Sequence, residues 1–196
     1  PLTTICFGQN SAVLTGSASG GLPAYTYSWS TGSTATSVTV GQRTYTFIVN
    51  DKTGCPPATA TAVVNSFTLP ITANAGPDQL VCKTSPSATL NGAVTSASSA
   101  VWSGGTGTIS PSNTSYTITY TPSAAELLAG FAQLYFTTTG NYGCPPDQDT
   151  VRINFQNVSI TNVSPSSTVC ANNNVVNLTG SVTGFSTTGV WSSSGT

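Results

Sequence analysis

The residues best able to do chemistry in this chain are its five cysteines, Cys6, Cys55, Cys82, Cys144 and Cys170. Cys55 and Cys144 share a Gly-Cys-Pro-Pro sequence, whereas the other three each precede a leucine by eight residues. Four cysteines allow three disulfide pairings, and the repeated context favours one bond within each repeat: Cys6 with Cys55, and Cys82 with Cys144. We expect the partner of Cys170 to lie outside the chain, with a free reactive thiol as the alternative.

Disulfide bonds of this kind would stabilise small modules and would need an oxidising environment. Closing a loop of about 50–60 residues contributes about 4 kcal/mol in the chain-entropy model, which is comparable to the whole stability of a small module. Such dependence predicts an extracellular protein. A zinc site is not expected, because the chain has no Cys-x-x-Cys sequence and no histidine.

Catalytic chemistry is not expected either, and we predict that the chain is not an enzyme. Serine and threonine are abundant, but no histidine can activate them, and the five carboxylates are scattered. Asp147 and Asp149 alternate as calcium ligands can, yet a calcium ion needs six to eight oxygens and carboxylates are scarce. We therefore predict no metal site and no cofactor.

The elements that must position the cysteines follow a repeat. In each copy a Leu-polar-Gly step lies eight residues after the cysteine and a tryptophan comes later. The copies are Cys6/Leu14/Trp29, Cys82/Leu90/Trp102 and Cys170/Leu178/Trp191. A tryptophan at a fixed place in a repeat is typical of core packing, so we assign Trp29, Trp102 and Trp191 to the core. The alternative is a platform on which sugars stack.

Composition predicts an all-β fold of short strands and many turns. Serine and threonine make up roughly a third of the chain, and hydrophobic residues make up 38%. Only 5% of residues are charged, and the net charge is −1, so no basic patch exists to bind nucleic acid. No apolar run approaches 18 residues, so we expect no membrane insertion.

The repeat divides the chain into three expected modules, at 1–66, 67–156 and 157–196. The second carries an insertion in which Ser123 and Glu126 form a capping box and Gly130 ends a single helical turn. The third is a truncated first half of a module. The links between modules are short and contain no flexible Gly/Ser run, which predicts a semi-rigid, rod-like array.

Several segments resemble the PKD-like and Ig-like tandem repeats of Bacteroidota cell-surface proteins, including gliding-motility adhesins. They are 73–79 (ANAGPDQ), 90–92 (LNG), 102–107 (WSGGTG), 120–122 (YTP) and Gly143-Cys144 in the second repeat, and 25–32 (YTYSWSTG), 45–51 (YTFIVND) and Gly54-Cys55 in the first. The resemblance implies tandem Ig/PKD-like β-sandwiches, exported to the bacterial cell surface by the type IX route. It also suggests an O-glycan at Thr150, because Asp149-Thr150-Val151 is similar to the acceptor sequence of that phylum.

These observations predict a structural extracellular repeat protein that forms part of a bacterial surface stalk or filament. Its expected partners are neighbouring copies or modules of the same array, together with glycans. Two alternatives remain: a carbohydrate-binding adhesin module, which requires exposed coplanar aromatic rings in a groove, and an accessory spacer of a secreted polysaccharide-degrading enzyme.

Overall fold

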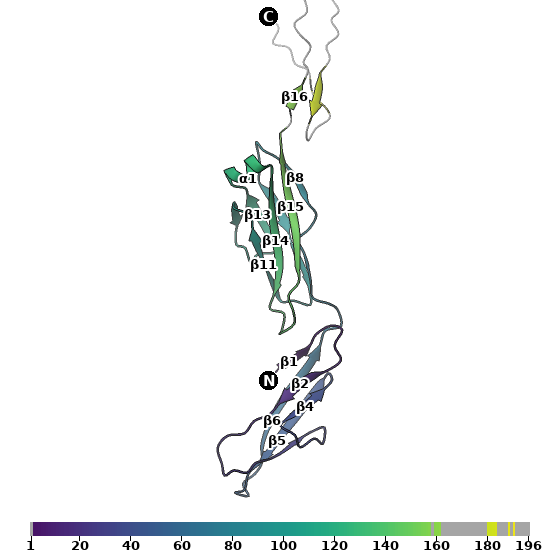
Figure 1. Ribbon diagram of the computed structural model, residues 1–196, viewed down its shortest axis with the longest axis vertical. Coiled ribbons are helices and arrows are strands. Elements are labelled where there is room, and N and C mark those ends of the chain that lie inside the picture. The colour runs from purple at the N-terminus through teal and green to yellow at the C-terminus, as the bar shows by residue number, and fades with distance from the viewer. Residues whose placement is uncertain (1, 158, 162–179, 184–187, 189, 191–196) are drawn as a thin grey trace, which may run out of the picture. The chain divides into compact units, whose positions relative to one another are not determined.

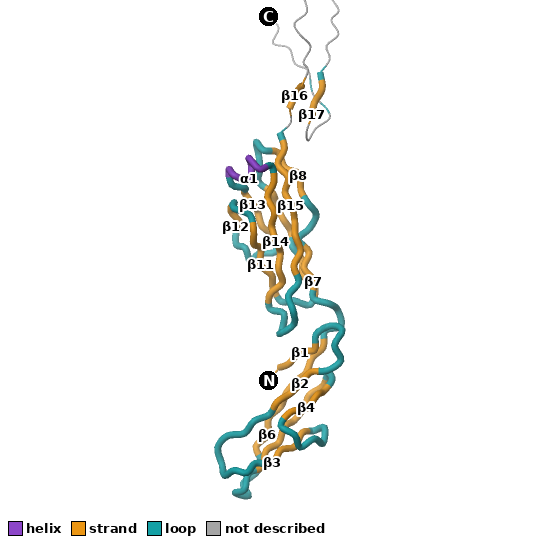
Figure 2. Tube along the Cα trace, viewed as in Figure 1, coloured by secondary structure: helices purple, strands orange, loops and turns teal. Residues whose placement is uncertain are grey.

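The computed structural model describes residues 2–157, 159–161, 180–183, 188 and 190. Strands dominate these residues, and one short helix interrupts them (Figures 1 and 2). The strands assemble into small sheets that enclose aromatic cores. The predicted fold class, all-β with tandem Ig-like sandwich modules, is thereby confirmed.

The first sandwich, β1 to β6, has a four-stranded sheet in the order β1-β6-β5-β3 and a two-stranded sheet of β2 and β4. The strands are β1 (Leu2–Ile5), β2 (Ala12–Thr15), β3 (Thr26–Trp29), β4 (Ser37–Val40), β5 (Arg43–Asn50) and β6 (Ala58–Ser66). β1 runs parallel to β6, with Leu2 opposite Val63, while the other pairs are antiparallel. The first and last strands of this sandwich are therefore neighbours that point the same way.

Alternating residues of these strands form the core of the first sandwich. On β5, Tyr45 and Phe47 are buried while Thr44 is exposed, which is the two-residue period of a strand with one face inward. The whole buried cluster is Ile5, Leu14, Trp29, Val40, Tyr45, Phe47, Ala62 and Val64. Because β2 and β4 contribute Leu14 and Val40, the cluster joins the two sheets.

The second sandwich, β7 to β15, contains sheets in the orders β11-β14-β15-β8, β12-β13-β9 and β10-β7. Its strands are β7 (Thr72–Asn74), β8 (Gln79–Cys82), β9 (Ala88–Asn91), β10 (Ala93–Thr95), β11 (Ser99–Gly104), β12 (Thr108–Ser110), β13 (Thr117–Thr121), β14 (Phe131–Thr139) and β15 (Gln148–Gln156). β8 runs parallel to β15, which repeats the arrangement of β1 and β6.

The expected helical turn is present as α1 (Ala124–Ala129), between β13 and β14. Ser123 and Glu126 form both hydrogen bonds of a capping box, and Gly130 ends the helix with φ 84°. That left-handed backbone favours glycine, so local sequence rules account for both ends of the helix.

Beyond residue 157 the structure describes one antiparallel pair, β16 (Ser159–Thr161) with β17 (Ser181–Thr183). Most of the expected third module, 157–196, including Cys170 and Trp191, lies outside the described residues. Its limits, like those at 1–66 and 67–156, stay a prediction.

Contacts divide the chain into two compact units. The first comprises Pro1–Asn74, Ala93–Val101 and Thr137–Gln148, and the second comprises Ala75–Gly92, Trp102–Phe136 and Asp149–Thr196. The first unit thus contains the first sandwich together with the turn between β14 and β15, where Cys144 lies.

Candidate functional site

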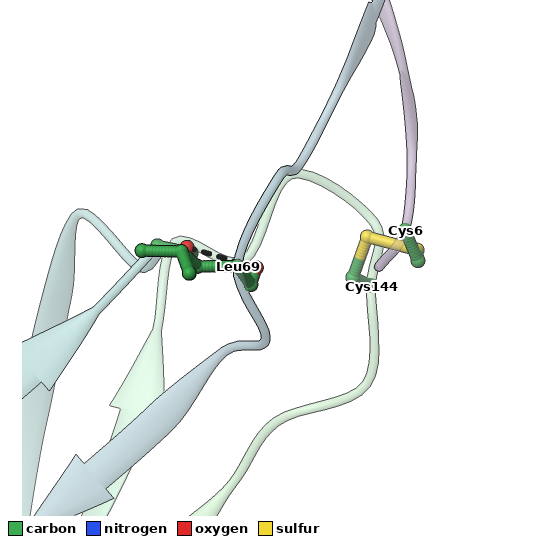
Figure 3. Close-up of a disulfide and its surroundings, with 4 residues drawn as sticks. Cys6, Leu69 and Cys144 are labelled. Atoms are coloured by element: carbon green, nitrogen blue, oxygen red, sulfur yellow. Dashed lines mark hydrogen bonds between the residues drawn. A yellow bond between two sulfur atoms is a disulfide. The ribbon is translucent and has the colours of Figure 1, made fainter. Parts of the chain in front are cut away.

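The feature most relevant to function is a disulfide bond between Cys6 and Cys144 (Figure 3). Cys6 directly follows β1, and Cys144 lies in the Gly-Cys-Pro-Pro turn between β14 and β15. Their Cα atoms are 5.6 Å apart although 138 positions separate them in the sequence. The bond therefore joins a cysteine of the first repeat to a cysteine of the second.

The predicted bond between Cys6 and Cys55 is wrong, and the register of β1 and β6 explains why. Ile5 lies opposite Ser66, so Cys6 lies at the end of β6, whereas Cys55 precedes the first residue of β6. A strand of nine residues spans about 30 Å, and a disulfide needs Cα atoms within about 7 Å. The two cysteines of one repeat therefore lie at opposite ends of its sandwich.

The predicted bond between Cys82 and Cys144 is wrong for the same reason. Cys82 lies opposite Gln156 at the end of β15, whereas Cys144 precedes β15. The Sγ atom of Cys82 lies 3.0 Å from the hydroxyl oxygen of Thr84.

We call the end of a sandwich that carries the Gly-Cys-Pro-Pro turn its upstream end, because its last strand begins there. The other end, where the cysteine follows the first strand, is the downstream end. In these terms the bond joins the downstream end of the first sandwich to the upstream end of the second.

Three further contacts lie in the same compact unit as this disulfide. The rings of Phe67 and Tyr142 meet edge to face with centroids 5.9 Å apart. The Phe67 N–H donates to the Ile5 carbonyl at 3.1 Å, which continues the β1–β6 pairing by one residue. The hydroxyl of Ser96 donates to the Leu69 carbonyl at 3.1 Å (Figure 3). Phe67 thus contacts both the strand that precedes Cys6 and the turn that presents Cys144.

The turn that presents Cys144 depends on two residues with left-handed backbone, Tyr142 at φ 54° and Gly143 at φ 88°. The Cys144 N–H donates to the Asn141 carbonyl at 2.9 Å and closes the turn. Glycine adopts such angles without strain, which gives a physical reason for Gly143 before the cysteine.

Asp147 and Asp149, the alternative calcium ligands, bind backbone amides instead. The N–H groups of Ala73 and Ala75 donate to their carboxylates, each at 2.8 Å. The Arg152 N–H donates to Asp78 in the same way at 2.8 Å. These aspartates therefore fasten the segment around β7 to β15, and the described residues contain no group of three or more candidate metal-binding side chains.

Thr150, the candidate glycosylation site, lies on β15 and its side chain is exposed. Its N–H donates to the Asp149 carboxylate at 2.8 Å. Exposure makes the hydroxyl accessible to an enzyme, and the glycan itself stays a prediction.

Trp29 and Trp102 lie in the cores, with exposed fractions of 4% and 0%. Each packs against a phenylalanine, Phe47 or Phe136, with ring centroids 4.5 Å apart in both sandwiches. Buried rings cannot stack on sugars. Trp191, the third assigned core residue, lies outside the described residues.

Sequence reasoning missed these two phenylalanines, although the Leu-polar-Gly step is a signal for them. A Cβ atom added to Gly92 would lie 2.5 Å from the Phe136 ring, and one added to Gly16 would overlap the Phe47 ring. The glycine of the step therefore packs directly against the phenylalanine ring, where a larger residue would not fit.

The buried carboxylate of Glu126, within α1, was also missed as a packing element. The Tyr120 hydroxyl donates to Glu126, 2.7 Å from Oε1 and 2.8 Å from Oε2. The N–H groups of Ser123 and Thr106 donate to the same carboxylate at 2.8 and 2.9 Å. Burial favours the neutral acid, but these hydrogen bonds outweigh it, so the pKa of Glu126 lies below its ordinary value.

Tyr120 responds in the opposite direction. Burial and the hydrogen bond to Glu126 raise the pKa of Tyr120 to about 12. Both groups therefore keep their usual charge at neutral pH, and the pair acts as a fastener between α1 and β13.

None of the described helices is long and apolar enough to cross a membrane.

No known protein family matches the sequence, and no curated protein matches it. Sidekick-1 immunoglobulin domains 1–5 are similar to 83% of this chain over 38% of their own length, with 11% identity and a TM-score of 0.32. Drosophila OTK extracellular domains 3–5 match 80% of this chain over 60% of their own length, with 13% identity and a TM-score of 0.40. The I9–I11 tandem from titin matches 83% of this chain over 65% of its own length, with 12% identity and a TM-score of 0.37. The chain spans less than two thirds of the length of each. At these scores the similarities carry no argument about function.

Proposed function

We propose that this chain is part of a structural, extracellular repeat protein that forms a stalk or filament on a bacterial cell surface. The observation that supports it best is the bond between Cys6 and Cys144, because it links successive repeats covalently. A disulfide of this kind persists in an oxidising compartment, which supports an extracellular location. The proposed partners are neighbouring modules or copies of the same array.

The mechanism we propose is mechanical. A tensile load applied to the two ends of this chain passes through the bond and bypasses residues 7–143, which lie between the two cysteines. The strands between them then bear no load while the bond is intact. A stalk built this way resists extension without depending on the stability of each small sandwich.

The bacterial origin and the glycan belong to the same proposal. The resemblance of segments such as 73–79 to Bacteroidota surface repeats supports the origin, and the exposure of Thr150 supports an O-glycan at that residue. With 5% charged residues, an attached sugar would also add polar surface.

The carbohydrate-binding alternative has weaker support. It requires coplanar exposed rings, but Tyr25 and Tyr27 form an angle of 44° and the described tryptophans are buried. We therefore place the adhesive function second to the structural one. The remaining alternative, an accessory spacer of a secreted polysaccharide-degrading enzyme, predicts a catalytic domain in the same polypeptide.

The test is to label intact cells of the source organism with antibodies against the folded chain and to image them by electron microscopy. Label on surface fibres, together with a native mass far above 19.8 kDa, is the expected result. A drop in mass on chemical deglycosylation would show that sugar is attached. Thr150→Ala should lower the native mass by the mass of the glycan at that residue. Label confined to the cell interior would contradict the proposal.

A further inference from the structure

The upstream end of the first sandwich carries a cysteine with an open surface. Cys55 lies in the Gly-Cys-Pro-Pro turn between β5 and β6, is exposed, and forms no disulfide with any described residue. Its position alone assigns Cys55 no role. A role must follow from the residues around it and from its counterpart in the second sandwich.

The counterpart is Cys144, which lies in the same tetrapeptide at the same place in the second sandwich. It is bonded to Cys6, a downstream-end cysteine of the preceding repeat, and retains an exposed fraction of 8%. The chain thus shows this turn once with its partner and once without.

The surface around Cys55 is hollowed. A pocket of about 400 Å³ opens there, lined by the turn and by residues that include Tyr25, Asp51, Cys55 and Ala58. Leu22, which is held beside this loop by its N–H bond to Asp51 at 3.1 Å, leaves 53% of its side chain exposed. An exposed apolar side chain and a pocket beside a thiol suit a segment of polypeptide.

The loop is also fixed in shape before any partner arrives. The Asp51 carboxylate accepts hydrogen bonds from the Thr53 N–H at 2.9 Å and from its hydroxyl. The bonds from Thr53, with that from Leu22, lower the pKa of Asp51, so the carboxylate stays ionised at neutral pH. A fixed loop loses little entropy when it binds.

We propose that Cys55 forms a disulfide with the downstream-end cysteine of a preceding repeat in the same polypeptide. This rests on the proposed function, because an array supplies that repeat. Two thiols become one disulfide, and the two electrons and two protons pass to a disulfide-bearing oxidoreductase, which is reduced to its dithiol. Bonds between successive repeats would then run through the array, each from a downstream end to an upstream end.

The test is disulfide mapping of the full-length native protein. Free thiols are alkylated before proteolysis without reduction, and the peptide that contains Cys55 is identified by mass spectrometry. The expected partner is a cysteine that precedes a Leu-polar-Gly step by eight residues, as Cys6 does. An alkylated Cys55, a bond between two copies of Cys55, or a bond to a separate polypeptide would each overturn the proposal.

Two variants sharpen the test. Cys55→Ser should release one newly alkylated cysteine with the downstream-end pattern, and the matched control Cys144→Ser should release Cys6 instead. If either variant fails to fold, the mapping of the native protein still decides. A free Cys55 in a protein that still forms surface fibres would overturn this inference alone, whereas absence of the fibres would overturn the proposed function.

Discussion

At the scale of single residues, the group of Tyr120, Glu126 and their backbone donors shows how a charge is kept inside a small sandwich. Glu126 has an exposed fraction of 8% and accepts bonds from a hydroxyl and two N–H groups. A buried carboxylate is costly unless such donors surround it. One residue therefore caps α1 and also ties it to β13.

Tyr120→Phe should destabilise the protein by about 1–3 kcal/mol, because it leaves a buried carboxylate and the Gly107 N–H with one partner fewer. The measurement is chemical unfolding monitored by circular dichroism. Tyr135→Phe is the control, since that hydroxyl accepts one exposed bond at 3.3 Å, and its effect should be small. Equal effects of the two substitutions would contradict the assigned role.

Acid should weaken the protein partly through Glu126. Its pKa in the folded protein lies below the ordinary 4.5. As the pH falls below 4.5, the unfolded chain binds a proton that the folded carboxylate does not, so stability falls until the folded pKa is passed. Glu126→Gln should therefore lose less stability than the native protein as the pH falls from about 5 to below the folded pKa of Glu126.

The comparison needs a control for other carboxylates. Asp51, whose pKa is also lowered, should keep its contribution in Glu126→Gln, and Asp51→Asn should leave the part due to Glu126 intact. If the stability of Glu126→Gln falls with decreasing pH as much as that of the native protein, the buried pair does not set the acid sensitivity.

At the scale of elements, each sandwich is organised by one glycine, one phenylalanine and one tryptophan. The strands β5 and β14 carry Phe47 and Phe136, whose rings pack against a tryptophan and against the glycine of the Leu-polar-Gly step. Close packing leaves no room for even one extra methyl group at these glycines.

Gly16→Ala and Gly92→Ala should each cost about 1–3 kcal/mol of stability, because the added methyl group forces a buried ring to move. Gly41→Ala is the matched control in the first sandwich, since its added Cβ would meet its nearest atom, the Asn10 carbonyl oxygen, at an ordinary 3.8 Å. Thermal unfolding of the three variants tests this, and a destabilised Gly41→Ala with an unaffected Gly16→Ala would contradict it.

At the scale of the whole molecule, the bond between Cys6 and Cys144 determines which part of the chain carries load. When the chain is pulled from its ends, the bond shields residues 7–143, which lie between the cysteines. Reduction should therefore add about 480 Å to the released contour length, at about 3.5 Å per residue. Optical tweezers with and without reductant measure this directly.

Cys144→Ser is the control in this experiment. It should give the long contour length in both conditions, because no bond remains to be reduced. An equal contour length for the native chain before and after reduction would show that the bond does not carry the load. In bulk, the chain-entropy model gives this bond up to about 5 kcal/mol of stability.

The sequence by itself determined the features that depend on near neighbours. Abundant threonine, valine and aromatic residues specified strands, the repeat specified tandem modules, and the tryptophan positions specified core residues in both described sandwiches. The ends of α1 followed from Ser123, Glu126 and Gly130, because a cap acts over one helical turn.

Only the tertiary structure decided the partners of the cysteines. The parallel pairing of β1 with β6 places residues such as Leu2 and Val63 side by side, and no local pattern encodes a contact of that range. Repetition suggested that each pair of cysteines closes its own module, but the parallel first and last strands separate them by the length of a sandwich. The same long-range packing decided that Phe47 and Phe136 cover glycines and that Asp147 and Asp149 bind backbone amides, since each contact joins distant segments through the folded core.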